Sequence, residues 1–146
     1  MLQEGMETLK RWGFTYKTVV FNWFKTTTTG KPYFGMGFHS RSGSELCLLG
    51  TRGHPKRISA SVRQCHTLPN LKHSAKPPEF RDLIVELMGD VPRIELFARE
   101  TDVPGWRTTG LEADGVDIRD LLASYSPQST SAEDPQLPLD FEDLAA

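Results

Sequence analysis

A run of β-branched and aromatic residues constrains the fold of this chain most strongly. Residues 15–25 read TYKTVVFNWFK, a composition typical of buried strands. Shorter apolar runs predict two more strands, ELCLL at 45–49 and RIELFA at 93–98. Because the chain has 146 residues, we expect one domain with a core of modest size.

Helices are expected around these strands. Residues 1–12 carry apolar side chains on one helical face, and residues 77–88 begin with two prolines and end before a glycine. A third, shorter helix is expected at 118–125. The order of strand, basic loop, helix and strand over residues 45–98 favours an α/β fold with parallel pairing.

Two segments do not fit a packed core. Residues 26–44 form a long polar connection rich in threonine and glycine, and connections of this length are usually functional or mobile. Residues 126–146 hold five acids, three prolines and no Lys or Arg, a composition that predicts disorder. We therefore expect a folded domain over 1–125 and an acidic disordered tail over 126–146.

The charges divide sharply along the chain. From Lys10 to Lys76 there are twelve Lys and Arg and one acid, a net charge of +11, whereas from Pro77 to Ala146 there are five Lys and Arg and sixteen acids, a net charge of -11. Such an asymmetry indicates a polyanionic partner, or two halves that neutralise each other across a folded surface. Charge alone leaves both readings open.

Several protein classes are excluded by pattern. No apolar run approaches the roughly 18 residues of a membrane span, and the N-terminus has no signal-peptide core, so we expect a soluble, intracellular protein. Cys47 and Cys65 form neither a disulfide framework nor a zinc-type pair. The sequence contains no phosphate-binding loop and no metal-ligand spacing, and we assign no metal site.

Seven short motifs follow one another in a fixed order, and their order is more specific than any single motif. They are RWGFTYK at 11–17, WFK at 23–25, GKPYFGMGFHSRSGSELCLLGTRG at 30–53, RISASVRQ at 57–64, HSAKPPE at 73–79, IELFARE at 94–100 and PGW at 104–106. Together they resemble the C-terminal part of the MT-A-type adenine methyltransferases. This family includes the mRNA adenosine methyltransferase and many phage and bacterial DNA adenine methyltransferases, and the phage and bacterial branch is the closer match.

The resemblance implies a Rossmann-like fold that transfers a methyl group from S-adenosylmethionine to the exocyclic amine of adenine. The acceptor motif of the family, Asp-Pro-Pro-Trp, is absent from these residues and is expected upstream of them. The predicted fold is therefore partial, without its N-terminal strands, and no catalytic residue is assigned. A truncated gene product, a chain begun at an internal Met and half of a split enzyme all remain open.

The resemblance also implies site residues. Glu45 and Lys76 match residues near the target base. The positions that match the S-adenosylmethionine pocket are Lys76, Glu95, Leu96, Phe97, Arg99 and Glu112. For Glu45 a surface acid at a strand edge is an equal alternative, and for Leu96 and Phe97 a plain buried strand explains the sequence as well.

Basic residues in the first half are candidate phosphate contacts. They are Lys25, Lys31, Arg41, Arg52, Lys56, Arg57 and Arg63. The expected partner is DNA in preference to RNA, together with the missing N-terminal half or a second methyltransferase subunit. The protein is expected in the cytoplasm of a bacterium or of a phage-infected host. The alternative function is a non-catalytic subunit that binds nucleic acid or a partner.

Overall fold

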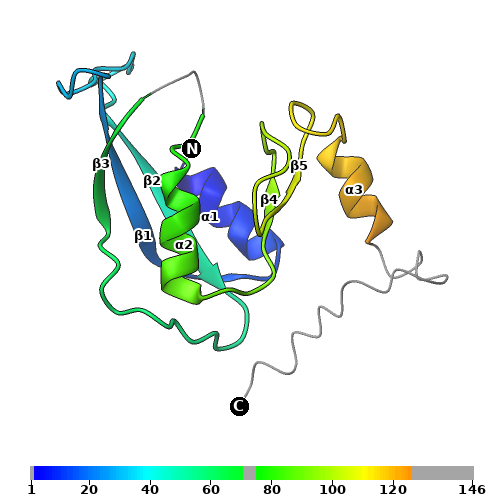
Figure 1. The fold of residues 1–146 in the computed structure, drawn as a ribbon. Coiled ribbons are helices and arrows are strands. Elements are labelled where there is room, and N and C mark those ends of the chain that lie inside the picture. The colour runs from blue at the N-terminus through cyan, green and yellow to red at the C-terminus, as the bar shows by residue number, and fades with distance from the viewer. Residues whose placement is uncertain (1, 71–74, 126–146) are drawn as a thin grey trace. The chain divides into compact units, whose positions relative to one another are not determined.

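The computed structural model describes residues 2–70 and 75–125, which divide into two compact units. The first unit ends at Gly89 and the second begins at Asp90. The helices and strands of the first unit are α1 (Leu2–Arg11), β1 (Thr15–Thr26), β2 (Ser44–Thr51), β3 (Cys65–Pro69) and α2 (Glu79–Met88) (Figure 1). Those of the second are β4 (Ile94–Leu96), β5 (Arg107–Thr109) and α3 (Ile118–Ser124).

A three-stranded sheet forms the centre of the first unit, with the order β2-β1-β3. The aromatic run forms the central strand β1, which pairs antiparallel with β2 and parallel with β3. Trp23 lies opposite Glu45 on one side and His66 on the other. Phe21 and Trp23 are almost fully buried, because a central strand with a helix on each face has little access to water.

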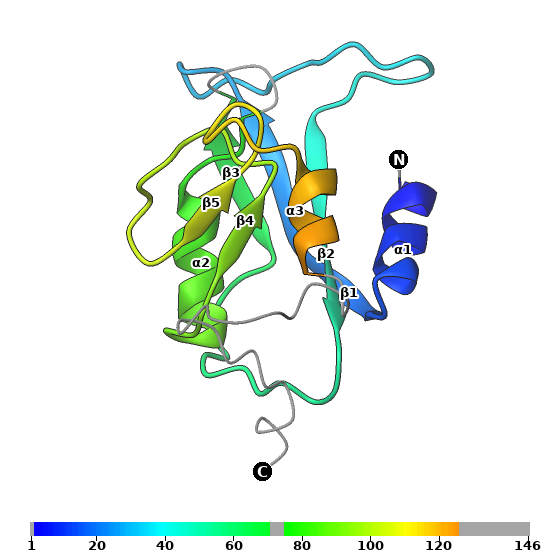
Figure 2. The same cartoon turned by 90° about the vertical axis from the view of Figure 1, so that its right-hand side faces the viewer.

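The two helices of this unit cover opposite faces of the sheet (Figure 2). Phe80 of α2 packs on the face of Phe21 and Trp23, with ring centroids 5.5 and 6.2 Å apart. On the other face, α1 approaches so closely that a Cβ at Gly50 would lie 2.8 Å from a methyl carbon of Leu9. A side chain at position 50 would therefore push α1 away from the sheet.

The second unit is built on two short parallel strands. Leu96 of β4 lies opposite Thr109 of β5, and the Ala98 amide extends the pairing by donating to the Thr109 carbonyl at 2.9 Å. Helix α3 is capped by Asp117, whose carboxylate accepts from the Arg119 amide at 2.8 Å. Hydrogen bonds from the Arg119 side chain and amide lower the pKa of Asp117 to about 2. This cap therefore remains charged across the neutral range.

The strand order differs from the predicted one. We expected the strand at 45–49 to pair in parallel with the strand at 93–98. In the structure β2 pairs antiparallel with β1, and β4 pairs with β5. Two strands were missed, because β3 is only five residues long and β5 only three. Helix and strand are mixed as predicted, the Rossmann-like arrangement stays a prediction, and the acidic tail at 126–146 lies outside the described residues.

Candidate functional site

Three charged side chains meet where β1 ends and β2 begins. Lys25 Nζ lies 2.5 Å from Glu45 Oε1, and Lys76 Nζ lies 2.8 Å from Glu45 Oε2. Each carboxylate oxygen therefore contacts one ammonium group. We call Lys25, Glu45 and Lys76 the lysine–glutamate cluster.

The packing of β1 and α2 positions this cluster. Trp23 and Glu45 are directly opposite each other, so their side chains share a face of the sheet, and Lys25 follows on that face two residues later. Lys25 Nζ lies 4.8 Å from the centre of the Trp23 ring, within the range of a cation–π contact. Phe80 anchors the start of α2 on Trp23, and this brings the preceding Lys76 to the carboxylate.

The electrostatics of the cluster keep Glu45 ionised. Partial burial acts to raise the pKa of Glu45, but hydrogen bonds from Lys25 and Lys76, together with their positive charges, outweigh it, and the pKa lies below its ordinary value. An ionised carboxylate has about four acceptor sites. Two lysine contacts therefore leave it able to accept a hydrogen bond from a polar ligand.

The cluster brings together residues that the sequence predicted separately. Glu45 and Lys76 were both expected near the target base, and the structure joins them. Lys25 was expected to contact phosphate, yet its side chain is only 14% exposed and contacts Glu45 and the Trp23 ring. Its role at phosphate stays a prediction.

A second group of predicted residues lies at the carboxyl ends of β4 and β5. Arg99 Nε and Nη2 lie 2.7 and 2.6 Å from Glu112 Oε2. Glu95 and Leu96 are half-buried within β4. In open α/β sheets ligands bind at the carboxyl ends of strands. Five of the six positions predicted for the cofactor lie in these strands or within three residues after them.

Phe97 has an unusual backbone conformation at this edge. Its φ angle is 59°, in the left-handed region that bulky residues rarely adopt, and its side chain is 70% exposed. Strained residues of this kind cluster at ligand sites. The predicted alternative of a plain buried strand therefore does not describe Phe97, which presents its ring to solvent.

Comparison with known proteins identifies the family. The family model MT-A70 matches residues 1–112, more than half of the chain. This chain belongs to the MT-A70 family. It is also similar to the type II methyltransferase M.MunI of Mycoplasma sp, with 36% identity over 103 residues, which are 69% of this chain and 41% of that protein. The chain thus spans less than half the length of this relative.

The match to the MT-A70 family covers both groups of candidate site residues. The matched range contains both the lysine–glutamate cluster and the Arg99–Glu112 pair. In the described part of the chain no helix is long and apolar enough to span a membrane. Nor do residues 2–70 and 75–125 hold a group of three His, Cys, Asp or Glu arranged for a metal ion.

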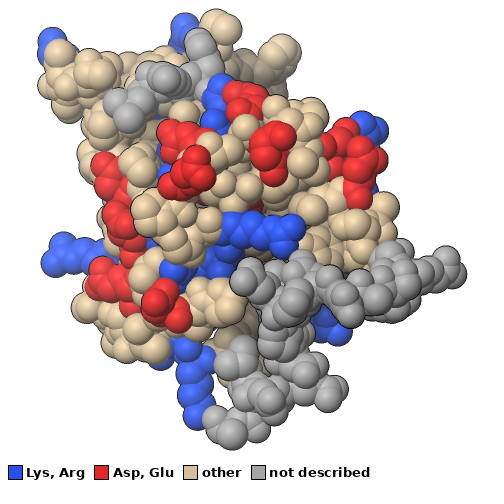
Figure 3. Space-filling model, turned by 45° about the vertical axis from the view of Figure 1, so that its right-hand side comes forward, with Lys and Arg blue, Asp and Glu red and all other residues tan. Residues whose placement is uncertain are grey.

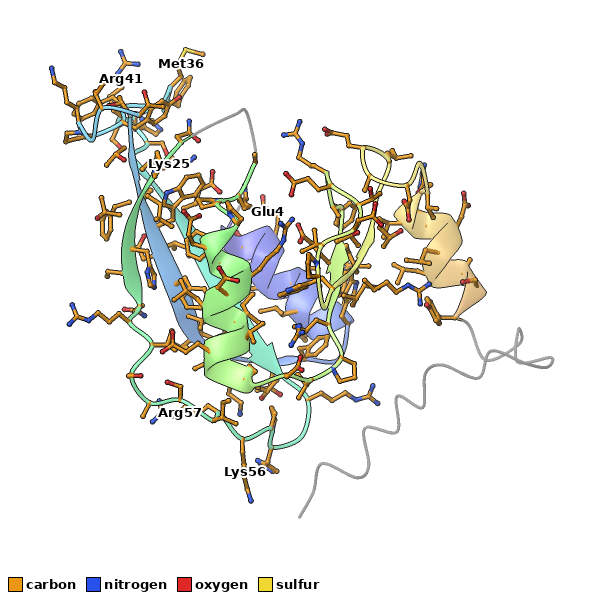
Figure 4. The ribbon with its side chains drawn as sticks, viewed as in Figure 1. Glu4, Lys25, Met36, Arg41, Lys56 and Arg57 are labelled. Carbon is orange, nitrogen blue, oxygen red and sulfur yellow. The ribbon has the colours of Figure 1, made fainter. Side chains whose placement is uncertain are left out.

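Most of the basic residues predicted to contact phosphate lie at two opposite ends of the three-stranded sheet. Lys31 and Arg41 lie in the loop that joins β1 to β2, and we call them the loop cluster. We call Arg52, Lys56 and Arg57 the turn cluster, because they follow β2 at the other end (Figure 4). Arg63 precedes β3. Figure 3 shows that both basic and acidic side chains reach the surface.

The sequence did not predict two positioning residues, Trp23 and Asp114. Trp23 Nε1 donates to the Leu68 carbonyl at 2.9 Å, which fixes the ring under Lys25. Asp114 accepts from the Gly110 and Val116 amides at 3.0 and 3.1 Å, and these hydrogen bonds lower its pKa. For Trp23, the spacing of two residues from Lys25 was a signal that could have indicated its role. For Asp114 the sequence held no such signal, because its contacts are made within a loop.

Proposed function

We propose that this chain takes part in the transfer of a methyl group from S-adenosylmethionine to the exocyclic amine of adenine in DNA. The observation that carries the proposal is the ion pair between Glu45 and Lys76. Two residues matched separately to the target-base site lie 2.8 Å apart, in a chain of a methyltransferase family.

The chemistry of adenine explains what such a cluster contributes. The exocyclic amine is a poor nucleophile because its lone pair is delocalised into the ring, so its hydrogens must be held by oriented acceptors. Glu45 is kept ionised by its lysines and can accept one of these hydrogens. Lys25 and Lys76 fix the orientation of the carboxylate. The Asp-Pro-Pro-Trp acceptor is not part of these residues, and no general base is assigned to them.

The Arg99–Glu112 edge fits the cofactor by its chemistry. S-adenosylmethionine, when bound, supplies an electrophilic sulfonium methyl group. Arg99 can pair with the cofactor carboxylate, Glu112 can accept hydrogen bonds from ribose hydroxyls, and the exposed Phe97 ring can stack on the cofactor adenine.

Transfer of radiolabelled methyl groups to adenine-containing DNA tests the proposal. The chain alone is expected to transfer none, because an oriented acceptor is worth about a hundred- to ten-thousandfold in rate. Adding a segment that carries Asp-Pro-Pro-Trp, fused or in trans, is expected to give transfer that Glu45→Gln lowers. Equal rates for Glu45→Gln and the original supplemented chain would contradict the role of Glu45.

A second candidate is a non-catalytic subunit that binds nucleic acid. It is favoured by the net charge of +11 between Lys10 and Lys76. DNA binding without methyl transfer, even after that segment is supplied, would establish it.

A further inference from the structure

The loop between β1 and β2 exposes three large apolar side chains. Phe34 is 73% exposed, Met36 is 95% exposed and Phe38 is 98% exposed. They alternate with Gly35 and Gly37. We call Phe34, Met36 and Phe38 the apolar tip, and Figure 4 shows Met36 beyond the end of the sheet, near Arg41. Exposed apolar side chains grouped in this way mark binding surfaces.

Backbone contacts define the shape of the loop. The Lys25 amide donates to Gly43 at 2.8 Å, the Tyr33 amide donates to Lys25 at 3.0 Å, and the Gly35 amide donates to Ser42 at 2.7 Å. At the turn, a Cβ at Gly37 would overlap the carbonyl oxygen of Ser40. The chain therefore turns back tightly beside the apolar tip, and the loop is a hairpin whose base is hydrogen-bonded.

The charges beside the apolar tip favour one kind of partner. Residues 27–43 contain Lys31, His39 and Arg41 and no Asp or Glu. An apolar group with cations on both sides matches a nucleic acid, in which apolar base faces lie between phosphates. An apolar protein surface would not require these cations.

We propose that the apolar tip inserts into the base stack of DNA while Lys31 and Arg41 contact the flanking phosphates. This inference rests on the proposed function, since it takes DNA as the substrate. Apolar side chains such as Phe and Met open base steps when they insert between them, and an adenine has to leave the stack to be methylated. The loop leads from Lys25 directly to Glu45, so the element that opens the stack adjoins the lysine–glutamate cluster.

Binding of the full chain to DNA tests this. The probe is an AT-rich duplex with 2-aminopurine, which fluoresces more strongly when unstacked, at several adenine positions. The variant replaces Phe34, Met36 and Phe38 with Ser, and the control is Leu2→Ser on α1, where Leu2 is 55% exposed. We expect the tip variant to bind roughly 10- to 100-fold more weakly and to lose the fluorescence increase, with no change for Leu2→Ser.

The salt dependence of DNA affinity distinguishes insertion of the apolar tip from the contacts that Lys31 and Arg41 make with phosphate. The tip variant is expected to keep the slope of log affinity against log salt, because it removes no cation. Lys31→Ala with Arg41→Ala is expected to reduce that slope by about two. Circular dichroism is expected to show unchanged folding, because the replaced side chains are exposed.

Three outcomes would overturn the inference. If the original chain binds DNA and the tip variant binds equally well with the same fluorescence, the insertion is wrong while the proposed function stands. If the original chain binds no DNA, both are wrong. If the tip variant instead abolishes self-association or protein binding and leaves DNA binding intact, the tip contacts protein.

Discussion

The ammonium group of Lys76 lies 2.8 Å from a carboxylate oxygen of Glu45, although one residue precedes α2 and the other begins β2. The other oxygen of the same carboxylate takes Lys25, whose side chain is only 14% exposed. The Glu45 carboxylate in β2 thus contacts both Lys25 in β1 and Lys76, which precedes α2. Its removal leaves Lys25 half-enclosed without its counter-charge.

Replacement of Glu45 by Gln is expected to lower the free energy of unfolding by about 1 to 2 kcal/mol. The Lys76 contact contributes little of this, since exposed pairs are worth at most about 1 kcal/mol, and the rest comes from the poorly solvated Lys25. Denaturation by urea measures the change. The matched control is Glu79→Gln, an exposed acid at the start of α2, with no comparable effect expected.

The stabilising effect of Glu45 is expected to vanish in acid. Because the folded-state pKa of Glu45 is lowered, its contribution is complete above the unfolded value of about 4.3 and is lost as pH falls through the folded value. The difference in unfolding free energy between the original chain and Glu45→Gln should therefore shrink below that pH. A difference that persists at the lowest pH at which the chain is still folded would show that the charge of Glu45 is not the cause.

The Trp23 indole is expected to stabilise the sheet through its hydrogen bond to Leu68. Trp23→Phe removes the indole N–H and leaves the Leu68 carbonyl without its hydrogen-bond donor. This is expected to lower the free energy of unfolding by about 1–3 kcal/mol. Trp12→Phe is the control, because Trp12 is 47% exposed. Thermal unfolding compares them, and equal midpoints for the two variants would contradict the importance of this contact.

DNA binding is expected to depend steeply on salt. Each phosphate that a Lys or Arg neutralises contributes about 0.9 to the slope of log affinity against log salt. Replacing Lys56, Arg57 and Arg63 with Ala should flatten the slope, whereas Lys10→Ala on α1 should not. Affinity that stays constant from low to moderate salt would refute the phosphate contacts.

S-adenosylmethionine is expected to bind weakly and through Arg99. Arg99→Ala should lower affinity about tenfold or more, since a charged hydrogen bond is worth about 1.5–3 kcal/mol. Titration calorimetry with the full chain measures this, and Arg107→Ala in β5 is the control. An unchanged affinity in Arg99→Ala would show that S-adenosylmethionine does not bind at the Arg99–Glu112 edge.

The strongest sequence signals predicted the corresponding elements. The aromatic composition of β1 and the proline and glycine boundaries of α2 are local, and both elements lie where expected. Pairing is not local. The structure joins β1 to β3, and nothing in the five residues CHTLP indicates which strand they will pair with.

The candidate site was predicted in composition but not in geometry. The motifs indicated Glu45 and Lys76 without showing that they touch. Lys25 was one of twelve Lys and Arg between Lys10 and Lys76, and only the face that it shares with Trp23 makes it a partner of Glu45. Likewise, the division of the basic residues between two ends depends on the antiparallel course of β2.

The separation of the loop cluster from the turn cluster sets a minimum length for a DNA duplex that contacts both clusters. Strand β2 spans Ser44–Thr51, or roughly 23 Å at about 3.3 Å per residue. A straight duplex rises about 3.4 Å per base pair, so one that lies along β2 and contacts both the loop cluster and the turn cluster must cover at least about seven base pairs. A shorter oligonucleotide reaches one end only.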